Sequence, residues 1–178
     1  IPKTIDSDIK FCYLTFGFYA AVAEAERLID CAHVEAKGAL NGVGLVKLMG
    51  REAGFIAAAA TVASGEANFT LIPEESFVLE GEYGFLPALK RRLQSRQHAV
   101  VVVAEGAGQD LLADAGNACD ASGNRRLGDI GLFLKERIIA YGAREELPIP
   151  VKYFDPSYYI RSVPATPADS LLGETLAR

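Results

Sequence analysis

The segment HAVVVVA, residues 98–104, constrains the fold of this chain more than any other stretch. A strand with one face in water alternates apolar and polar residues, whereas this run is continuously apolar. It therefore predicts a strand of a parallel sheet that is covered on both faces. The apolar runs of the chain are too short to span a bilayer.

The patterns before and after this strand predict an alternation of strands and helices. Further strands are expected at 41–50, 67–77 and 147–155, where apolar runs are bounded by turn residues. Helices are expected at 15–38, 51–65, 84–96, 126–142 and 167–178. Such an alternation indicates an α/β domain with a largely parallel sheet.

The charge balance and the cysteines limit the class of protein. The formal net charge is −5, which argues against nucleic-acid binding, so an anionic ligand must be held by a few local cations. The 3 cysteines contain no CxxC pair, and their odd number gives no closed disulfide framework. We therefore expect an intracellular protein, bound to no membrane, whose cysteines are small core residues.

Three motif-like loops follow predicted strands: LMGRE, AEGAGQ and FDPSYYIR. In open α/β sheets, ligands bind outside the carboxyl ends of the strands. We therefore expect the three loops to converge on one crevice.

The N-terminal stretch TIDSD places Asp6 and Asp8 two residues apart. If this stretch is extended, both side chains point to the same face. Two such carboxylates can divide labour, one accepting a proton and the other lying near a divalent metal. The competing interpretation is a hydrated acidic turn, which is common for Asp and Ser.

The loops after the strands carry groups that suit a phosphorylated sugar. Arg51, after Met49 and Gly50, offers a planar fork for phosphate, and Glu105 stands among glycines where it can accept hydrogen bonds from sugar hydroxyls. Each loop also has a plainer interpretation as a simple strand-to-helix turn.

The last loop presents hydroxyl and guanidinium groups that suit a phosphate, on Tyr158, Tyr159 and Arg161, and the strand before it contains Lys152. The plainer interpretation is a surface turn after Pro156. Together the loops suggest phosphoryl transfer involving a sugar phosphate.

These stretches also occur together, in the same order, in a known family. PKTIDSDI at residues 2–9 resembles the PKTIDNDI loop of the 6-phosphofructokinases, and VVVAEGAGQDLL and KYFDPSYYIRS also match. The resemblance covers essentially the whole chain and is nearest to the plant-type ATP-dependent branch. It implies a three-layer αβα fold. Residues 1–40 would lie at the edge of a nucleotide domain, and residues 41–178 would form a fructose-6-phosphate-binding domain that is incomplete at its C-terminus.

The resemblance implies transfer of a phosphoryl group from ATP to the 1-hydroxyl of fructose 6-phosphate, giving fructose 1,6-bisphosphate in glycolysis. Asp6 would be the general base, Arg51 would stabilise the migrating group, and Asp8 would help to organise Mg²⁺-bound phosphates, with Thr4 in the same catalytic loop. Lys3 would lie in the phosphoryl-donor region. The residues implied to contact the sugar phosphate are Thr4, Ile5, Asp6, Met49, Gly50, Arg51, Glu105, Lys152, Tyr158 and Arg161.

The family also implies an allosteric homo-oligomer, in which a neighbouring subunit can grip the 6-phosphate. A cytoplasmic location is expected, or a plastid location if a transit peptide preceded Ile1.

Two positions depart from the family pattern. Ser7 stands where asparagine is usual, and Tyr19 stands where FGFD is typical. The second change removes a carboxylate at the start of a helix, which costs about 0.5 kcal/mol.

The family's glycine-rich GGDGT loop lies upstream of PKTID, so we expect the chain by itself to be inactive. Two other functions stay open. One is a pyrophosphate-dependent phosphofructokinase, because Lys3 occurs with either donor. The other is a non-catalytic regulatory subunit that binds a sugar phosphate.

Overall fold

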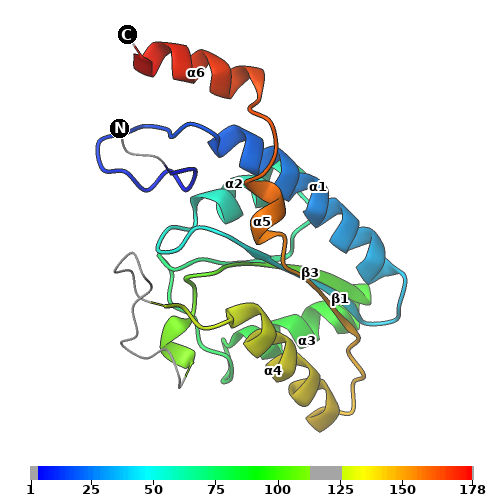
Figure 1. Ribbon diagram of the computed structural model, residues 1–178. Coiled ribbons are helices and arrows are strands. Elements are labelled where there is room, and N and C mark those ends of the chain that lie inside the picture. The colour runs from blue at the N-terminus through cyan, green and yellow to red at the C-terminus, as the bar shows by residue number, and fades with distance from the viewer. Residues whose placement is uncertain (1–3, 113–125, 178) are drawn as a thin grey trace.

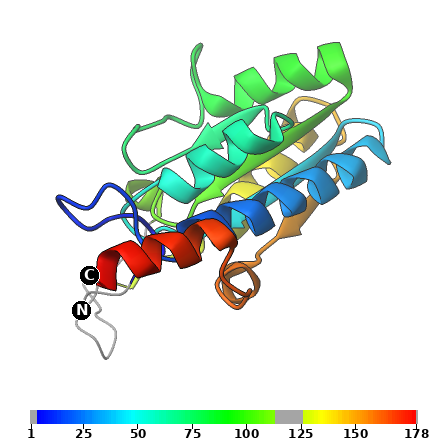
Figure 2. The same ribbon diagram turned by 90° about the horizontal axis from the view of Figure 1, so that it is seen from above.

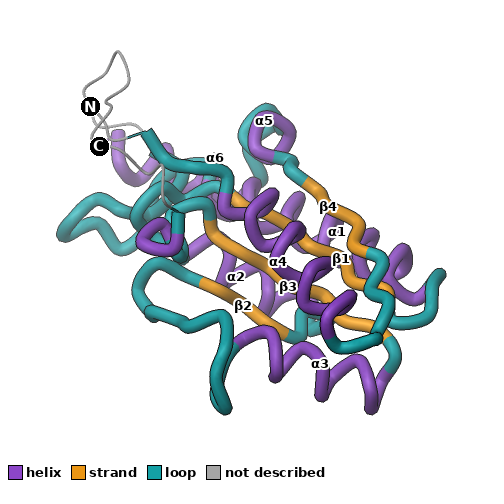
Figure 3. Tube along the Cα trace, turned by 90° about the horizontal axis from the view of Figure 1, so that it is seen from below, coloured by secondary structure: helices purple, strands orange, loops and turns teal. Residues whose placement is uncertain are grey.

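Four parallel strands, in the order β2-β3-β1-β4, form the centre of the computed structural model, which describes residues 4–112 and 126–177 (Figure 1, Figure 3). The strands are β1 (Gly42–Leu48), β2 (Phe69–Leu71), β3 (His98–Ala104) and β4 (Val151–Phe154). The helices are α1 (Phe18–Lys37), α2 (Phe55–Ser64), α3 (Phe85–Arg96), α4 (Ile130–Arg144), α5 (Ser157–Ile160) and α6 (Pro167–Ala177), with a 3-10 helix, η1 (Gln109–Leu111). The predicted α/β class with a parallel sheet is confirmed.

Strand β3 lies between β2 and β1 and is buried on both faces, as its apolar run predicted. Val101 and Val103 belong to an apolar cluster with α3 and α4 on one face of the sheet. Val100 and Val102 belong to a second cluster with α1 and α2 on the other face. The two helical layers make the three-layer arrangement that Figure 1 shows.

Helix α1 turns a face of small residues toward the sheet. Ala25, Ile29 and Ala32 are fully buried there, and alanine lets the helix lie close to the strands. The neighbouring Cys31 is exposed on the outer face of α1, and Cys12 is exposed in the N-terminal loop. The prediction that the cysteines are small core residues is therefore wrong for these two, and Cys119 lies outside the described residues.

The carboxyl ends of β1 and β3 lie at the same edge of the sheet, because Leu48 and Ala104 are partners in the parallel register. The Glu105 amide donates a hydrogen bond of 2.8 Å to the Leu48 carbonyl, so the two following loops leave the sheet together. Among the residues that the structure describes, no helix is long and apolar enough to cross a membrane. The expected division of the chain at residue 40 stays a prediction.

Candidate functional site

Asp6 stands among charged groups from three other parts of the chain. The carboxylates of Asp8 and Glu105 repel its charge, and the guanidinium groups of Arg51 and Arg161 attract it. Burial is the largest influence, and together with the two carboxylates it raises the pKa of Asp6 to about 6 against the pull of the arginines. Asp6 Oδ1 is buried and has no hydrogen-bond partner among the described residues. One charged residue from each of the three predicted loops thus lies near Asp6, so the loops do come together, while the crevice between them stays a prediction.

The loop of residues 4–17 is held by two threonine hydroxyls. Thr4 Oγ1 accepts from the Asp6 amide at 3.1 Å, and the buried Thr15 Oγ1 accepts from the Ser7 amide at 3.1 Å. Ser7 has a φ of 59°, so the loop is not extended there. The expectation that Asp6 and Asp8 share one face fails for this reason, and Asp8 is exposed while Asp6 is half-buried.

The turns after β1 and β3 pack against each other. A Cβ atom on Gly106 would lie 1.7 Å from the Arg51 carbonyl oxygen, so only glycine allows this approach. The side chain of Gln109 is buried, and its amide donates to the carbonyls of Glu105 (2.7 Å) and Gly128 (3.1 Å). These contacts hold Arg51 and Glu105 on adjacent turns, next to the predicted substrate residues Met49 and Gly50.

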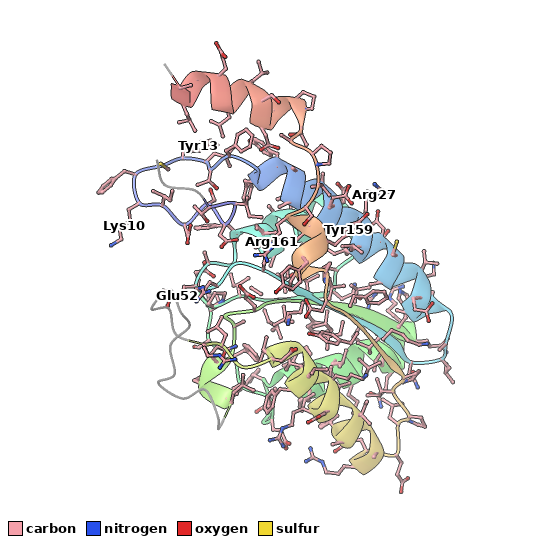
Figure 4. The ribbon with its side chains drawn as sticks, viewed as in Figure 1. Lys10, Tyr13, Arg27, Glu52, Tyr159 and Arg161 are labelled. Atoms are coloured by element: carbon pink, nitrogen blue, oxygen red, sulfur yellow. The ribbon has the colours of Figure 1, made fainter. Side chains whose placement is uncertain are left out.

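Tyr158 of α5 and Arg161, the residue that follows this helix, lie together. The Arg161 guanidinium carbon lies 4.5 Å from the centre of the Tyr158 ring, in a cation–π contact. Figure 4 shows Arg161 beside α5, on the side of the N-terminal loop. Tyr159 instead lines a separate cavity of about 450 Å³ with Arg27 and Leu28 of α1, so the two neighbouring tyrosines face different surroundings.

Among the predicted site residues that the structure describes, Lys152 is not brought to this edge. Lys152 pairs in the sheet with Gly44, near the start of β1, and its ammonium lies 3.1 Å from a carboxylate oxygen of Glu35. Lys3 lies outside the described residues. The roles of these and of the other predicted site residues stay predictions.

The phosphofructokinase family matches residues 1–178, which is the whole chain. The chain belongs to the phosphofructokinase family. Its relatives in that family include ATP-dependent 6-phosphofructokinase 7 of Arabidopsis thaliana, 47% identical over 180 residues that cover 100% of this chain and 37% of the relative.

A second relative is ATP-dependent 6-phosphofructokinase 5, chloroplastic, of the same plant. It is 48% identical over 100% of this chain and 33% of its own length, so the chain spans about a third of the length of these phosphofructokinases. Among solved structures, the phosphofructokinase of Saccharomyces cerevisiae has a similar fold, with a TM-score of 0.70 at 24% identity over 97% of this chain and 20% of that one.

Several residues that build the site escaped sequence reasoning. Thr15 and Gln109 are buried polar side chains whose partners lie in other loops. Glu74, which accepts from the Gly54 amide at 2.8 and 3.0 Å, supports the start of α2. Asp169 had a local signal, because T-x-x-D before an apolar run resembles a capping box.

Proposed function

We propose that the protein to which this chain belongs transfers a phosphoryl group from ATP to the 1-hydroxyl of fructose 6-phosphate. The observation that carries this proposal is Asp6, a half-buried carboxylate with an unpartnered oxygen, which the charges of Arg51 and Arg161 attract. Its pKa of about 6 leaves it mostly ionised at pH 7, yet makes it a better proton acceptor than an ordinary aspartate. The names of the relatives, at 47% and 48% identity, support ATP as the donor.

The other groups at the edge suit the charge that such a reaction develops. Phosphoryl transfer depends mainly on positioning and charge neutralisation. In this proposal Arg51 stabilises the migrating group, Glu105 accepts hydrogen bonds from the sugar, and Arg161 with Tyr158 binds the 6-phosphate. Thr4 and Ile5 line the acceptor loop, and Met49 and Gly50 line the sugar-phosphate turn.

The described residues suit a magnesium ion that is bound mostly through substrate. They contain no group of three His, Cys, Asp or Glu side chains able to hold a metal. Mg²⁺ keeps several waters and is commonly held by one or two carboxylates and the substrate phosphates. Asp8 is exposed and lies two residues after Asp6, whose Oδ1 has no hydrogen-bond partner among the described residues. Asp8 would be such a carboxylate. When bound, the ion would neutralise phosphate charge.

We also infer a homo-oligomer in the cytoplasm or, as for the relative named chloroplastic, in a plastid. The exposed pair of Tyr158 and Arg161 supports this, because a phosphate bound there stays open to a second subunit.

An assay with fructose 6-phosphate and either ATP or pyrophosphate tests the proposed function. We expect the whole protein that carries this chain to turn over fructose 6-phosphate with ATP but not with pyrophosphate. Turnover with pyrophosphate but not with ATP would identify the other donor. Sugar-phosphate binding without turnover would show a regulatory subunit.

The variant Asp6→Ala tests the proposed base. We expect kcat to fall by about 100- to 10,000-fold, because the acceptor of the hydroxyl proton is lost. The affinity for fructose 6-phosphate should change little, which equilibrium binding measures separately. An unchanged kcat would remove Asp6 from this role.

A further inference from the structure

One carboxylate caps the N-termini of two helices that are far apart in the sequence. Asp169 of α6 is fully buried. Its Oδ1 accepts from the Gly17 amide at 3.0 Å and its Oδ2 from the Ala20 amide at 3.0 Å, at the start of α1. The same Oδ2 accepts from the amide (3.1 Å) and the hydroxyl (2.6 Å) of Thr166, at the start of α6. Figures 1 and 2 show α6 beside the start of α1.

Helix α1 has no cap of its own. Gly17 precedes its first residue and has no side chain, and the first turn contains no acidic residue. Tyr19 occupies the position where the family pattern has a carboxylate. Asp169 supplies that negative charge from the other end of the chain, where it favours the positive end of the α1 dipole. Burial alone would raise the pKa of Asp169, but the hydrogen bonds from Thr166, Gly17 and Ala20 outweigh it and hold the pKa below its ordinary value.

The capped residue Gly17 also supports the loop that contains Asp6. A Cβ atom on Gly17 would lie 2.8 Å from Ile5 Cγ2, so the Gly17 backbone packs directly on Ile5. Two residues earlier, Thr15 accepts the Ser7 amide hydrogen bond. The residues on both sides of Asp6 are therefore held by the segment that leads into α1.

We propose that Asp169 is a positioning residue that anchors Gly17 and thereby holds the Asp6 loop against the edge that carries Arg51, Glu105 and Arg161. Asp169 touches neither substrate nor the reacting atoms in this proposal. It acts through the backbone of residues 15–17 on residues 5–7. Its effect on turnover rests on the proposed function, whereas its effect on the loop does not.

The variant Asp169→Asn tests the anchor, because it keeps the shape but removes the charge and turns an NH₂ group toward amide donors. In the protein that carries this chain, kcat should fall about 10- to 100-fold, since catalytic geometry is sensitive to displacements near 1 Å. The KM for fructose 6-phosphate should change much less. Hydrogen exchange of the Ser7 amide, which needs no turnover, should become faster.

Thr166→Val is the matched control. It removes the hydroxyl that caps α6 but leaves the bonds from Gly17 and Ala20 to Asp169. We expect hydrogen exchange of the Ser7 amide to be slower in Thr166→Val than in Asp169→Asn. The kcat of Thr166→Val should stay close to that of the unmodified protein. Should Asp169→Asn not fold, Asp169→Ser replaces it, because serine is shorter but keeps a polar group at the start of α6. Its kcat and Ser7 exchange should change as for Asp169→Asn.

Tyr19→Asp in the Asp169→Asn background separates anchoring from helix capping. It gives α1 a carboxylate in its first turn, so it should recover the thermal stability that Asp169→Asn loses with the cap. It should restore neither kcat nor the slow hydrogen exchange of the Ser7 amide. Recovery of both would overturn the proposal, as would an Asp169→Asn protein with unchanged kcat and unchanged exchange. If the unmodified protein has no activity with either donor and Ser7 exchange still accelerates in Asp169→Asn, the proposed function fails while the anchor stands.

Discussion

The carboxyl of Asp6 titrates close to neutral pH because burial and two neighbouring carboxylates outweigh two arginines. Below about pH 6 the group is protonated and accepts no proton, so kcat/KM should fall on the acid side of that value.

In the variant Asp8→Asn, the fall of kcat/KM on the acid side of the pH profile (its acidic limb) should occur at lower pH. It removes a negative charge that raises the pKa of Asp6, so Asp6 stays ionised in more acidic solution. The measurement is the pH profile of kcat/KM, in which Asp8→Glu serves as the control that keeps the charge. A limb that stays in place after Asp8→Asn would show that Asp8 does not influence Asp6.

Ser7 shows how one departure from the family pattern is accommodated. Its φ of 59° lies in the left-handed region, where asparagine is more readily tolerated than serine. The hydrogen bond from its amide to Thr15 keeps the conformation. The asparagine of the family pattern suits this backbone conformation, which the sequence alone did not indicate.

Among the secondary-structure elements, β1, α4 and α5 are joined through Lys47. The Lys47 ammonium lies 2.8 Å from Asp155 Oδ2 and 3.4 Å from Asp129 Oδ2. Asp155 Oδ1 accepts from the Ser157 amide at the start of α5, and Asp129 Oδ1 caps α4. The Lys47 side chain is only 12% exposed, whereas the side chains of Asp129 and Asp155 are each 35% exposed. Burial raises the pKa of Asp155, but Lys47 and Ser157 lower it below its ordinary value.

The variant Lys47→Met should lower the free energy of unfolding at pH 7 by about 1–3 kcal/mol. This is less than for a fully buried pair, because the carboxylates are partly exposed. Asp155 has a lowered pKa in the folded state, so its stabilisation is present above about pH 4 and is lost as the pH falls further. Urea unfolding at pH 7 and pH 3 should therefore show a smaller difference at pH 3. An equal difference at both values would contradict an ionic origin.

Elements with a strong local signal were predictable, and contacts between distant residues were not. The continuous apolar run placed β3, and α2 ends at Ser64 before Gly65, whose φ is 68°. The loops that carry Arg51, Glu105 and Arg161 were predicted to meet, because parallel strands end at one edge. Asp6 was linked to them only by the resemblance to the 6-phosphofructokinases. The cap from Asp169 to Gly17 and Ala20 and the pairing of Lys152 with Glu35 depend on how helices pack. No local pattern contains that information.

At the scale of the whole molecule, the two apolar clusters lie on opposite faces of the same sheet. Leu134 of α4 is fully buried in one, and Ile56 of α2 is fully buried in the other. Leu134→Ala and Ile56→Ala should each lower the free energy of unfolding by about 2–5 kcal/mol.

Each of these variants should still unfold in one transition, because β3 contributes side chains to both clusters. Circular dichroism and tyrosine fluorescence during urea unfolding check this. Two separated transitions would show that the layers are independent.

The parallel register also has a consequence for how the chain folds. Gly42 of β1 pairs with His98, and Val43 pairs with Val151, so every strand pairing in the described residues waits for a distant segment. Non-local pairing of this kind makes folding slow, because loop closure precedes any gain from contacts. During synthesis, β1 has no strand partner among the described residues until β3 emerges from the ribosome.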